Sequence, residues 1–445
     1  MIEVSPELLL KNGIIIRNGR EITRSVAVQT GKIEGIYESG MEPPSETVVD
    51  CRGLYIFPGA IDMHVHLRDL GEADKEDYSS GTRAAAAGGV TTVVDMPNSK
   101  PPVLSQEILA IKIERAKRRR YVNVGFYAGI PAHISDFHSR IKQDILGLKV
   151  YPHSPLSAGT EYDTTRIKSC MYLAQQNDLP LLFHPDASDP MARPIDMEQF
   201  FETHSCRSET DSISMFIAAQ KGTGARVHVC HVSCAASARL ITDARAEDRL
   251  TAEVTPHHLF LSGTDFSNVD GTAKVLPPLR SHDDNRVLKD SLLKCAIDVV
   301  VSDHAPHTTL EKRRHFMNAP SGFPGLETTV PLLLTEVFQG HLSWVEYLRV
   351  CSSGPARLLG LIGKGLLSKG YDADLIVVAK EDWTVEGRKF QSKAKITPFE
   401  GVTVKARPVM TIVSGEIVYD HEKFKVGPGS VGTVPVRSIA RPRNT

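Results

Sequence analysis

Two histidines, His64 and His66, stand two residues apart just after an apolar run, residues 54–61. The run predicts a buried strand, and side chains alternate between the two faces of a strand. His64, His66 and Arg68 should therefore share one face, and the other should carry Met63, Val65 and Leu67. Two imidazoles on one wall can bind one metal ion because their ring nitrogens converge. Two core histidines are the alternative, but the charged flanks of the pair favour a metal site.

Polar residues also follow other apolar runs of the chain. They are Asn98 after residues 90–96, Lys149 in 146–151, His184 after 179–183, His231 after 226–230 and Asp303 after 296–301. Such groups are unfavourable in a packed core, because burying an unpaired polar group costs free energy. Together with the histidine pair they put polar side chains at six strand ends, which indicates a site rather than solvated loops.

The ligand types point to two metal ions. Four histidines and one aspartate exceed the four ligands of one tetrahedral zinc. They suit two ions about 3.5–4 Å apart, the spacing of two-metal hydrolytic sites. Such a pair needs a bridging anion, and Lys149 is the candidate, because its amine can react with carbon dioxide to give a carbamate with two oxygens. The alternative is that Lys149 pairs with a carboxylate.

The elements that must position these residues follow a strand-then-helix rhythm. Eight apolar or β-branched runs, which also include residues 121–128 and 251–255, alternate with helical stretches such as 78–87, 106–119, 165–177, 211–221 and 235–245. Eight β/α units over about 250 residues predict an α/β protein with a TIM (β/α)8 barrel, whose active site lies at the C-terminal ends of the strands. A doubly wound sheet is the alternative, but no G-x-G-x-x-G motif follows an early strand.

Both ends of the chain show short β-rich runs broken by turn signals. Asn12-Gly13, Asn18-Gly19 and Thr30-Gly31 separate such runs near the N-terminus, and Ser414-Gly415 does so near the C-terminus. We expect one small β-sandwich domain, discontinuous in sequence, from residues 1–56 and 366–430. Residues 57–365 then form the catalytic barrel, and residues 431–445 form a surface tail.

Composition narrows the class of protein. A net charge of −1 over 445 residues, with no basic stripe, argues against a nucleic-acid partner. The seven cysteines are scattered without a C-x-x-C pair, which fits a reducing cytoplasm better than a disulfide framework. No segment has the apolar length that a membrane span needs, and the N-terminus lacks a secretory pattern. We therefore expect a cytoplasmic protein that does not contact membranes.

Several short motifs make the chain similar to a known family. They are Asp62-Met-His-Val-His-Leu-Arg68, Ala84-Ala-Ala-Ala-Gly-Gly-Val-Thr-Thr92, Asp95-Met-Pro-Asn98, Pro256-His-His-Leu259, Pro277-Pro-Leu-Arg280, Ser302-Asp-His-Ala-Pro-His307, Gly322-Phe-Pro-Gly-Leu-Glu327 and Ser392 followed by Pro398-Phe-Glu-Gly401. Over nearly its whole length the chain resembles the cyclic amidohydrolases of the metal-dependent amidohydrolase superfamily, and most of all the dihydroorotases. The metal motifs are typical of the superfamily, whereas Arg68, Asn98 and His307 together narrow the resemblance to dihydroorotases.

The resemblance implies a set of metal ligands and a mechanism. The ligands of two zinc ions would be His64, His66 and Asp303 for one, His184 and His231 for the other, with carboxylated Lys149 and a hydroxide as bridges. The hydroxide would attack the ring amide carbonyl of L-dihydroorotate, and Asp303 would carry the proton to the leaving nitrogen. The reverse reaction closes N-carbamoyl-L-aspartate, a step of pyrimidine biosynthesis.

The resemblance also implies how the substrate is held. Arg68 would pair with the substrate carboxylate, helped by Asn98 and His307. A homodimer and an association with a carbamoyltransferase are left open.

Two positions depart from the family pattern. Many long-chain bacterial dihydroorotases carry an aspartate where this chain has Lys149, so the expected bridge resembles that of the hydantoinases. The residue before Pro277 is Leu276 rather than the frequent asparagine. Which group contacts the substrate ring at that point is therefore left open.

Rival activities share the same metal site. Allantoinase and hydantoinase or dihydropyrimidinase differ in that their substrates need no carboxylate clamp. A non-catalytic scaffold relative is the alternative from a different class, and the complete set of ligand positions argues against it.

The remaining histidines are weaker candidates. We expect His257 and His258 to orient their neighbours and His228 to be structural, on the strand face opposite His231. The other histidines of this kind are expected at the surface or in loops: His133, His138, His153, His204 and His315. The long, charged loop 305–322 either covers the site as a lid or is exposed filler.

Overall fold

The computed structural model describes residues 5–189, 191–245, 249–266 and 271–437. Its central sheet has eight strands in the order β13-β12-β11-β10-β9-β8-β7-β6, and neighbours run parallel. A parallel bridge between Val65 and His304 joins the two edges, so the sheet closes. The predicted TIM barrel is confirmed. The strands are β6 (Ala60–Val65), β7 (Val90–Asp95), β8 (Asn123–Ala128), β9 (Gly147–Val150), β10 (Leu181–Phe183), β11 (Val227–Val229), β12 (Leu250–Val254) and β13 (Val299–Val300).

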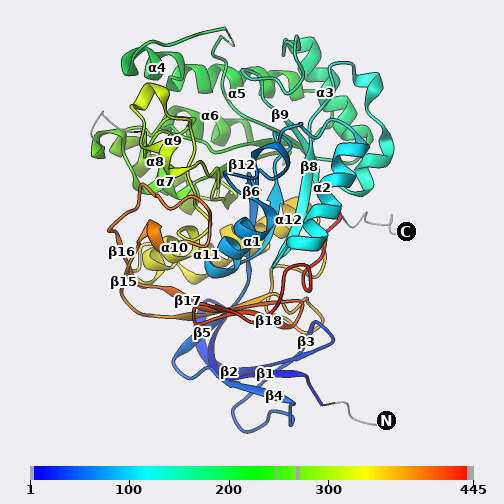
Figure 1. The fold of residues 1–445 in the computed structure, drawn as a ribbon, viewed down its shortest axis with the longest axis vertical. Helices are drawn as coiled ribbons and strands as arrows, with labels where there is room; N and C mark the ends of the chain where they lie inside the picture. Colours follow the sequence, from blue (N-terminus) through cyan, green and yellow to red (C-terminus); the bar gives the residue numbers. More distant parts are fainter. Residues whose placement is uncertain (1–4, 190, 246–248, 267–270, 438–445) are drawn as a thin grey trace.

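Most helices lie around the outside of the barrel (Figure 1). The side chains of Asp77, Ser105 and Asp163 accept hydrogen bonds from the first turns of α1, α2 and α3, which explains where these helices begin. The helices are α1 (Tyr78–Ala87), α2 (Gln106–Arg119), α3 (Thr164–Gln176), α4 (Met197–Thr203), α5 (Cys206–Gln220), α6 (Ala235–Ala244), α7 (Pro256–Phe260), α8 (His282–Leu293), α9 (Thr309–Lys312), α10 (Thr329–Phe338), α11 (Trp344–Leu348) and α12 (Gly354–Leu359). Among the described residues, no helix combines the length and the apolar character needed to cross a membrane.

Both ends of the chain build a second sheet, which lies below the barrel in Figure 1. Its order is β19-β18-β17-β14-β5-β1-β2-β3, with β4 paired to β1. The strands are β1 (Leu8–Arg17), β2 (Arg20–Gln29), β3 (Lys32–Tyr37), β4 (Thr47–Asp50), β5 (Leu54–Pro58), β14 (Leu375–Ala379), β17 (Arg407–Val413), β18 (Glu416–Asp420) and β19 (Lys423–Phe424). The antiparallel pair β5–β14 joins the two chain ends. A sheet-rich region drawn from both termini is thus present, and the exact division into domains stays a prediction.

Two expectations about strands were wrong. The run 54–61 is not one strand: β5 belongs to the terminal sheet and β6 to the barrel, and Gly59 separates them. A Cβ at Gly59 would lie 2.1 Å from Oγ1 of Thr91, so only glycine fits at this crossing. Asn12-Gly13 does not end a strand either. β1 continues through it with a bulge, and Asn12 has a φ of 61°.

The N-terminal end of the barrel is closed by apolar packing. Inside the barrel, Met63 and Leu182 belong to one cluster with Leu359 of α12. The described part of the tail lies at the same end, where Arg437 donates hydrogen bonds to the carbonyl oxygens of Leu358 and Leu359. Residues 438–445 of the predicted tail lie outside the described residues. The opposite end, where the strands finish, is therefore the end that can admit a substrate.

The segment between β14 and β17 leaves the terminal sheet and packs on the barrel. It contains a short ribbon of β15 (Trp383–Thr384) and β16 (Thr403–Val404). Val385, Phe390 and Phe399 of this segment form an apolar cluster with Leu261 and Leu332 of the barrel. This contact ties the C-terminal part of the chain to the loops around the barrel.

Candidate metal centre

Three predicted ligands converge on one point at the C-terminal end of the barrel. Nε2 of His64 lies 3.4 Å from Oδ1 of Asp303, and Nε2 of His66 lies 3.2 Å from the same oxygen. All three side chains are buried, and their ligand atoms lie within 4.8 Å of one another. Two imidazole nitrogens and a carboxylate oxygen at such distances can bind one divalent ion.

The two histidines reach this point through an irregularity in β6. The pairing of β6 with β7 shifts between Asp62 and Val65, where β6 contains one extra residue. Met63 therefore packs inside the barrel, whereas Val65 belongs to the outer core. The expectation that strict alternation puts Met63 and Val65 on one face was wrong. The bulge turns His64 and His66 together towards the mouth of the barrel.

A second pair of predicted ligands lies on the neighbouring strands. Nδ1 of His184 and Nε2 of His231 are 2.9 Å apart, and the opposite ring nitrogens, Nε2 of His184 and Nδ1 of His231, are buried without a hydrogen-bond partner in the described structure. Two ligands at about 2.0–2.1 Å from one tetrahedral zinc are themselves close neighbours. This pair therefore fits a second ion.

Lys149 lies inside the barrel on β9, between the two groups of ligands. Its Nζ donates to Sγ of Cys230 at 2.7 Å and lies 5.1 Å from the ring centre of Tyr151. In the part of the chain that the structure describes, Lys149 forms no ion pair with a carboxylate, so the simpler alternative for this residue is not observed. A fully buried amine beside metal ligands fits the predicted bridging carbamate, whose formation stays a prediction.

Sequence reasoning missed Glu253, a buried carboxylate on β12. It accepts a hydrogen bond from Nδ1 of His64, and its other oxygen lies 3.0 Å from Nε2 of His228. A carboxylate on Nδ1 fixes the ring of His64 so that Nε2 is the nitrogen that can exchange its proton for a metal ion. His228 is thus inside the barrel rather than on the face opposite the site. A glutamate within the otherwise apolar run 250–254 was the available signal.

Charge in the centre is dominated by the two carboxylates. Burial alone disfavours the charged imidazolium, but Glu253 and Asp303 raise the pKa of His64 to about 10. Burial disfavours the charged form of Asp303, yet His64 and His66 hold its pKa well below the ordinary value. Burial lowers the pKa of His231 and of His184, which are therefore neutral. Two buried carboxylates, with the neutral rings of His184 and His231 beside them, form an electrostatic environment that favours a cation.

Arg68 forms the wall of the site beside this centre. It is partly buried, and its Nε donates to the carbonyl oxygen of Pro306 at 3.2 Å. Among the described residues it has no carboxylate partner, because Asp69 pairs with Arg115 and Glu72 pairs with two lysines. The alternative that Arg68 pairs with Asp69 or Glu72 is therefore not observed.

The two other predicted substrate contacts flank Arg68 and His66. Nε2 of His307 lies 3.1 Å from Nη2 of Arg68 and 3.1 Å from the carbonyl oxygen of Ser321. Burial, followed by the charge of Arg68, lowers the pKa of His307 to about 2, so this ring is neutral. Oδ1 of Asn98 accepts from Nδ1 of His66 at 2.7 Å, which leaves the amide nitrogen of Asn98 to meet a substrate.

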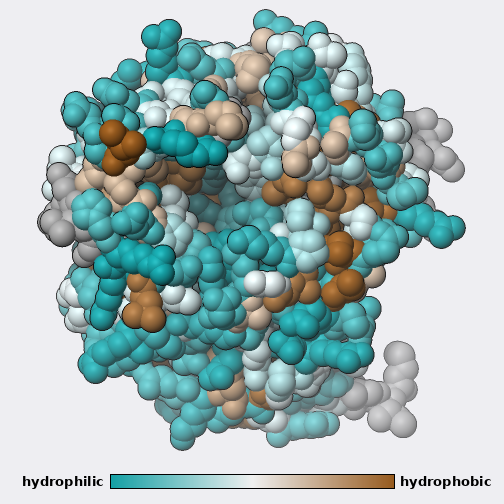
Figure 2. All heavy atoms as spheres, turned by 45° about the horizontal axis from the view of Figure 1, so that its top comes forward, coloured by the Kyte–Doolittle hydropathy of each residue, from teal (hydrophilic) through white to brown (hydrophobic). Residues whose placement is uncertain are grey.

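The loop 305–322 is not exposed filler. Phe316 and Ala319 are buried, and Nζ of Lys312 donates to the carbonyl oxygens of Lys274 and Pro320. The loop carries Pro306 and His307 and so forms one side of the site. Figure 2, in which the top of Figure 1 turns forward, shows a hollow near the middle of this face with hydrophilic residues in its wall. Whether the loop moves as a lid stays a prediction.

The other histidines divide into two groups. His258 holds the segment before α8, because its Nε2 contacts the carbonyl oxygen of Pro277 at 3.1 Å, as expected for an orienting residue. His153 and His204 lie in loops, which the sequence allowed, but both are partly buried, next to His184 and Asp186 respectively. The ring of His153 lies 4.7 Å from that of His184, and Nδ1 of His204 is 2.7 Å from the carboxylate of Asp186.

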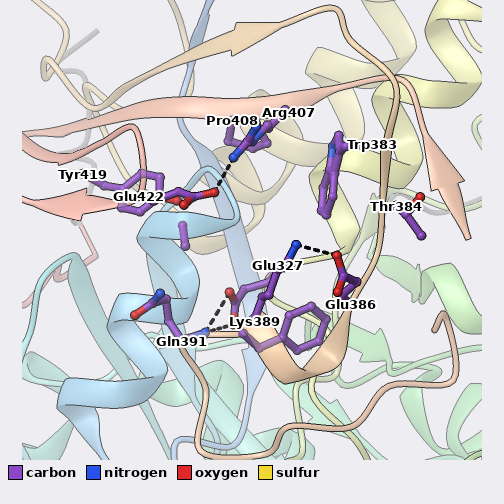
Figure 3. A pocket seen from close by; sticks show the side chains of 12 residues that line it. Glu327, Trp383, Thr384, Glu386, Lys389, Gln391, Arg407, Pro408, Tyr419 and Glu422 are labelled. Atoms are coloured by element: carbon purple, nitrogen blue, oxygen red, sulfur yellow. Dashed lines mark hydrogen bonds and ion pairs between the residues drawn. The ribbon is translucent and has the colours of Figure 1, made fainter. Parts of the chain in front are cut away.

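A cavity of about 510 Å³ lies away from this centre, between the barrel and the terminal sheet (Figure 3). Trp383 and Tyr419 line it, and none of the predicted site residues does. Its charged groups are paired among themselves: Arg407 with Glu422, Lys389 with Glu386, and Glu327 with the backbone of Gln391. Because these charges are already paired, this cavity does not offer a cation to a substrate carboxylate, as Arg68 does in the metal centre.

Comparisons with known proteins agree with this geometry. Residues 55–418 match the model of the family described as "Amidohydrolase family". The chain is 33% identical to a dihydroorotase from Lactobacillus gasseri over 432 residues, which are 93% of this chain and 99% of that protein. It is 34% identical to a dihydroorotase from Pyrococcus furiosus over 416 residues, which are 93% of this chain and 92% of that protein.

A solved structure shares the fold. An L-hydantoinase (dihydropyrimidinase) from Arthrobacter aurescens superposes with a TM-score of 0.90 at 26% identity, and the match covers 97% of this chain and 100% of that one. Since the family model and the curated relatives each cover most of the sequence, the chain belongs to the amidohydrolase family, and it is a cyclic amidohydrolase.

Proposed function

We propose that this enzyme is a dihydroorotase: it hydrolyses the ring amide of L-dihydroorotate to N-carbamoyl-L-aspartate, and closes the ring in the reverse direction, in the cytoplasm. Curated relatives with this name cover nearly the whole chain. The observation that carries the proposal is Arg68. A guanidinium beside a metal centre is repelled unless an anion lies between them, and Arg68 has no carboxylate partner in the described part of the chain. A substrate with its own carboxylate provides that anion.

The substrate carboxylate can be held by a small set of donors. Arg68 offers a bidentate fork, for which a carboxylate is the matching group. If Nε2–H of His307 donates to Ser321, then Nη2 of Arg68 keeps its hydrogens for the substrate. The amide nitrogen of Asn98 adds a neutral donor on the side of His66.

The metal centre would hold two zinc ions. His64, His66 and Asp303 are suited to one ion and His184 and His231 to the other, with carboxylated Lys149 between them. When bound, the metal ions would supply a water of lowered pKa and polarise the ring carbonyl. Glu253 would hold Nδ1 of His64, and Asn98 would hold Nδ1 of His66, so that Nε2 of each ring is directed to the ion.

Asp303 is the residue placed to move the proton. Its carboxylate is held in ionised form by the neighbouring imidazoles and lies at the mouth of the barrel. It would accept a proton from the attacking water and deliver it to the leaving ring nitrogen, first as general base and then as general acid.

One kinetic comparison tests the proposal. The purified protein is assayed on L-dihydroorotate, hydantoin, dihydrouracil and allantoin, and the metal content of the same sample is measured. We expect the highest kcat/KM for L-dihydroorotate, with about two zinc ions associated with turnover. A preference for an uncharged ring would instead assign the chain to the hydantoinase or dihydropyrimidinase activity, which its likeness to the A. aurescens enzyme favours.

A further inference from the structure

A second cluster of metal-binding side chains lies beside the centre described above. His153 follows β9, His184 and Asp186 follow β10, and the ring of His184 lies 4.7 Å from that of His153. One ligand atom from each of these three residues lies within 4.8 Å of the other two. The cluster shares only His184 with the proposed two-ion centre.

Two ring nitrogens in this cluster have no partner. Nδ1 of His153 and Nε2 of His184 are buried and form no hydrogen bond in the described structure. His184 directs its other nitrogen, Nδ1, to His231. Because an unpaired buried polar atom is costly, these two nitrogens indicate that a ligand belongs between them.

The carboxylate of Asp186 is fixed in place for such a ligand. Its Oδ1 accepts hydrogen bonds from Oγ of Ser208 at 2.6 Å and from the backbone nitrogen of Ser188 at 2.8 Å. Its Oδ2 lies 2.7 Å from Nδ1 of His204 and 3.9 Å from Nδ1 of His153. Carboxylates that bind metal ions are commonly held by outer hydrogen bonds of this kind. No lysine or arginine pairs with Asp186 among the described residues, so its charge is available to a cation.

We propose that His153 Nδ1, Asp186 Oδ2 and His184 Nε2 form a further site for a divalent metal ion. Two imidazole nitrogens and one carboxylate oxygen suit zinc and leave a fourth position for water. A neutral His184 carries one ring proton. When both of its nitrogens bind ions, that proton is released to solvent and the imidazolate links the two ions. The further ion ties the loop after β9 to the loop after β10, which also carries α4 and His204.

This inference rests on the proposed function only through His184, and counting metal ions tests it without substrate. The full-length protein is equilibrated in a zinc-buffered solution, and zinc per chain is measured by mass spectrometry after removal of free metal. We expect three ions for the wild type and two for His153→Gln, with circular dichroism showing the fold retained. His133→Gln, a change at an exposed loop histidine, is the matched control and should keep three.

A second variant separates a ligand from a packing residue. His153→Asp offers a carboxylate oxygen in place of the imidazole nitrogen and should regain the ion that His153→Gln loses. Equal zinc content in the wild type and His153→Gln overturns the inference. Loss of the ion in both variants also overturns it, because His153 would then act through packing. Absence of dihydroorotate turnover with a difference of one ion would overturn the proposed function and leave this site standing.

Discussion

At the scale of single residues, Lys149 has the least ordinary environment. It is fully buried inside the barrel, and its described contacts are the thiol of Cys230 and the ring of Tyr151. Lys149→Ala should therefore lose most of the bound metal and the activity, with partial recovery when short carboxylic acids are added. Metal analysis and turnover of the same samples measure this. An unmodified Lys149 amine in an active, metal-loaded crystal would falsify the bridging role.

A change at Asp303 should affect catalysis without affecting folding. Its carboxylate contacts His64 of β6 and His66 directly after it, and the backbone around it is anchored by the bridge from Val65 to His304. Asp303→Asn should keep the fold and lower kcat by about 10²–10⁴-fold, the range that a general acid–base group contributes. Steady-state kinetics together with a melting curve test this. Turnover within a few-fold of the wild type would remove Asp303 from proton transfer.

Arg68 should determine specificity rather than metal binding. Arg68→Met keeps the apolar stem and removes the charge, so both ions should stay bound. The kcat/KM for dihydroorotate should fall, because the variant loses about 2–5 kcal/mol of transition-state stabilisation. This is the cost of losing one partner of a buried charge pair. Turnover of uncharged cyclic amides should change far less. Normal turnover of dihydroorotate by this variant would end the dihydroorotase assignment and leave the metal centre untouched.

Single residues also show where sequence reasoning succeeds and where it fails. His184 and Asp303 could be predicted because they follow apolar strands that end at the same mouth. Glu253 was missed because a charged residue inside a strand run looks like an exposed position. The contacts of His153 with His184 and of His204 with Asp186 were not predicted, because the path of a loop depends on tertiary contacts that no local pattern records.

At the scale of elements, the turn after β6 is held by a buried network. Glu76 accepts hydrogen bonds from Oγ of Ser392 and of Ser80, and lies 3.4 Å from Nε2 of His304. The backbone N–H of His66 in turn donates a hydrogen bond to the carbonyl oxygen of His304 at 2.7 Å. The C-terminal motif beginning at Ser392 thus supports the strand end that carries the metal ligands.

Removing one member of this network should weaken the fold. Ser392→Ala leaves the carboxylate of Glu76 short of a donor, which costs about 1–3 kcal/mol when the group is buried. Chemical unfolding of the whole protein measures this loss. Ser430→Ala, at an exposed serine, is the control and should change stability by less than about 0.5 kcal/mol. Equal stability of both variants would contradict the supporting role of Ser392.

Several residues around the site have a strained backbone. Arg68, Asp69 and Leu70 have φ values of 54°, 50° and 47°, and His231 and Asp303 have φ values of 32° and 47°. A non-glycine residue with a positive φ costs about 1–3 kcal/mol, and this conformation persists only where the surrounding structure holds it in place. Helices such as α1 and α2 could be predicted to the residue from their caps and periodicity. The β6 bulge and these strained turns could not, because local propensity disfavours them and only the site requires them.

At the scale of the whole molecule, stability should depend on pH through Glu327. This carboxyl lies between the barrel and the segment from 391, and burial raises its pKa to about 8. The folded state therefore holds the proton more tightly than the unfolded chain, whose glutamate pKa is near 4.5. This contribution to stability is full below pH 4.5 and is lost as pH rises towards 8.

Replacing Glu327 should remove that dependence. Relative to Glu327→Gln, the wild type should lose at most about 1.4 kcal/mol per pH unit between pH 4.5 and 8. Unfolding curves across this range measure the difference. Glu416→Gln, at an exposed residue, should follow the wild type. Parallel curves for the wild type and Glu327→Gln would exclude Glu327 as the source of the pH dependence.

The terminal sheet cannot be completed until the C-terminal part of the chain has been synthesised. Lys32 and Asp372, which pair across this sheet, are 340 residues apart in sequence. Leu375 of β14, which pairs with Pro58 of β5, follows it by 375 − 58 = 317 residues. Ribosomes add about 5–20 residues per second, so β5 has to wait roughly 16–63 s before β14 emerges to cover its edge. During that interval an apolar strand, directly continuous with the first strand of the barrel, stands open to other chains. The molecule is therefore most vulnerable to aggregation while it is being synthesised, when the proposed catalytic residues already exist but the partner strand of β5 does not.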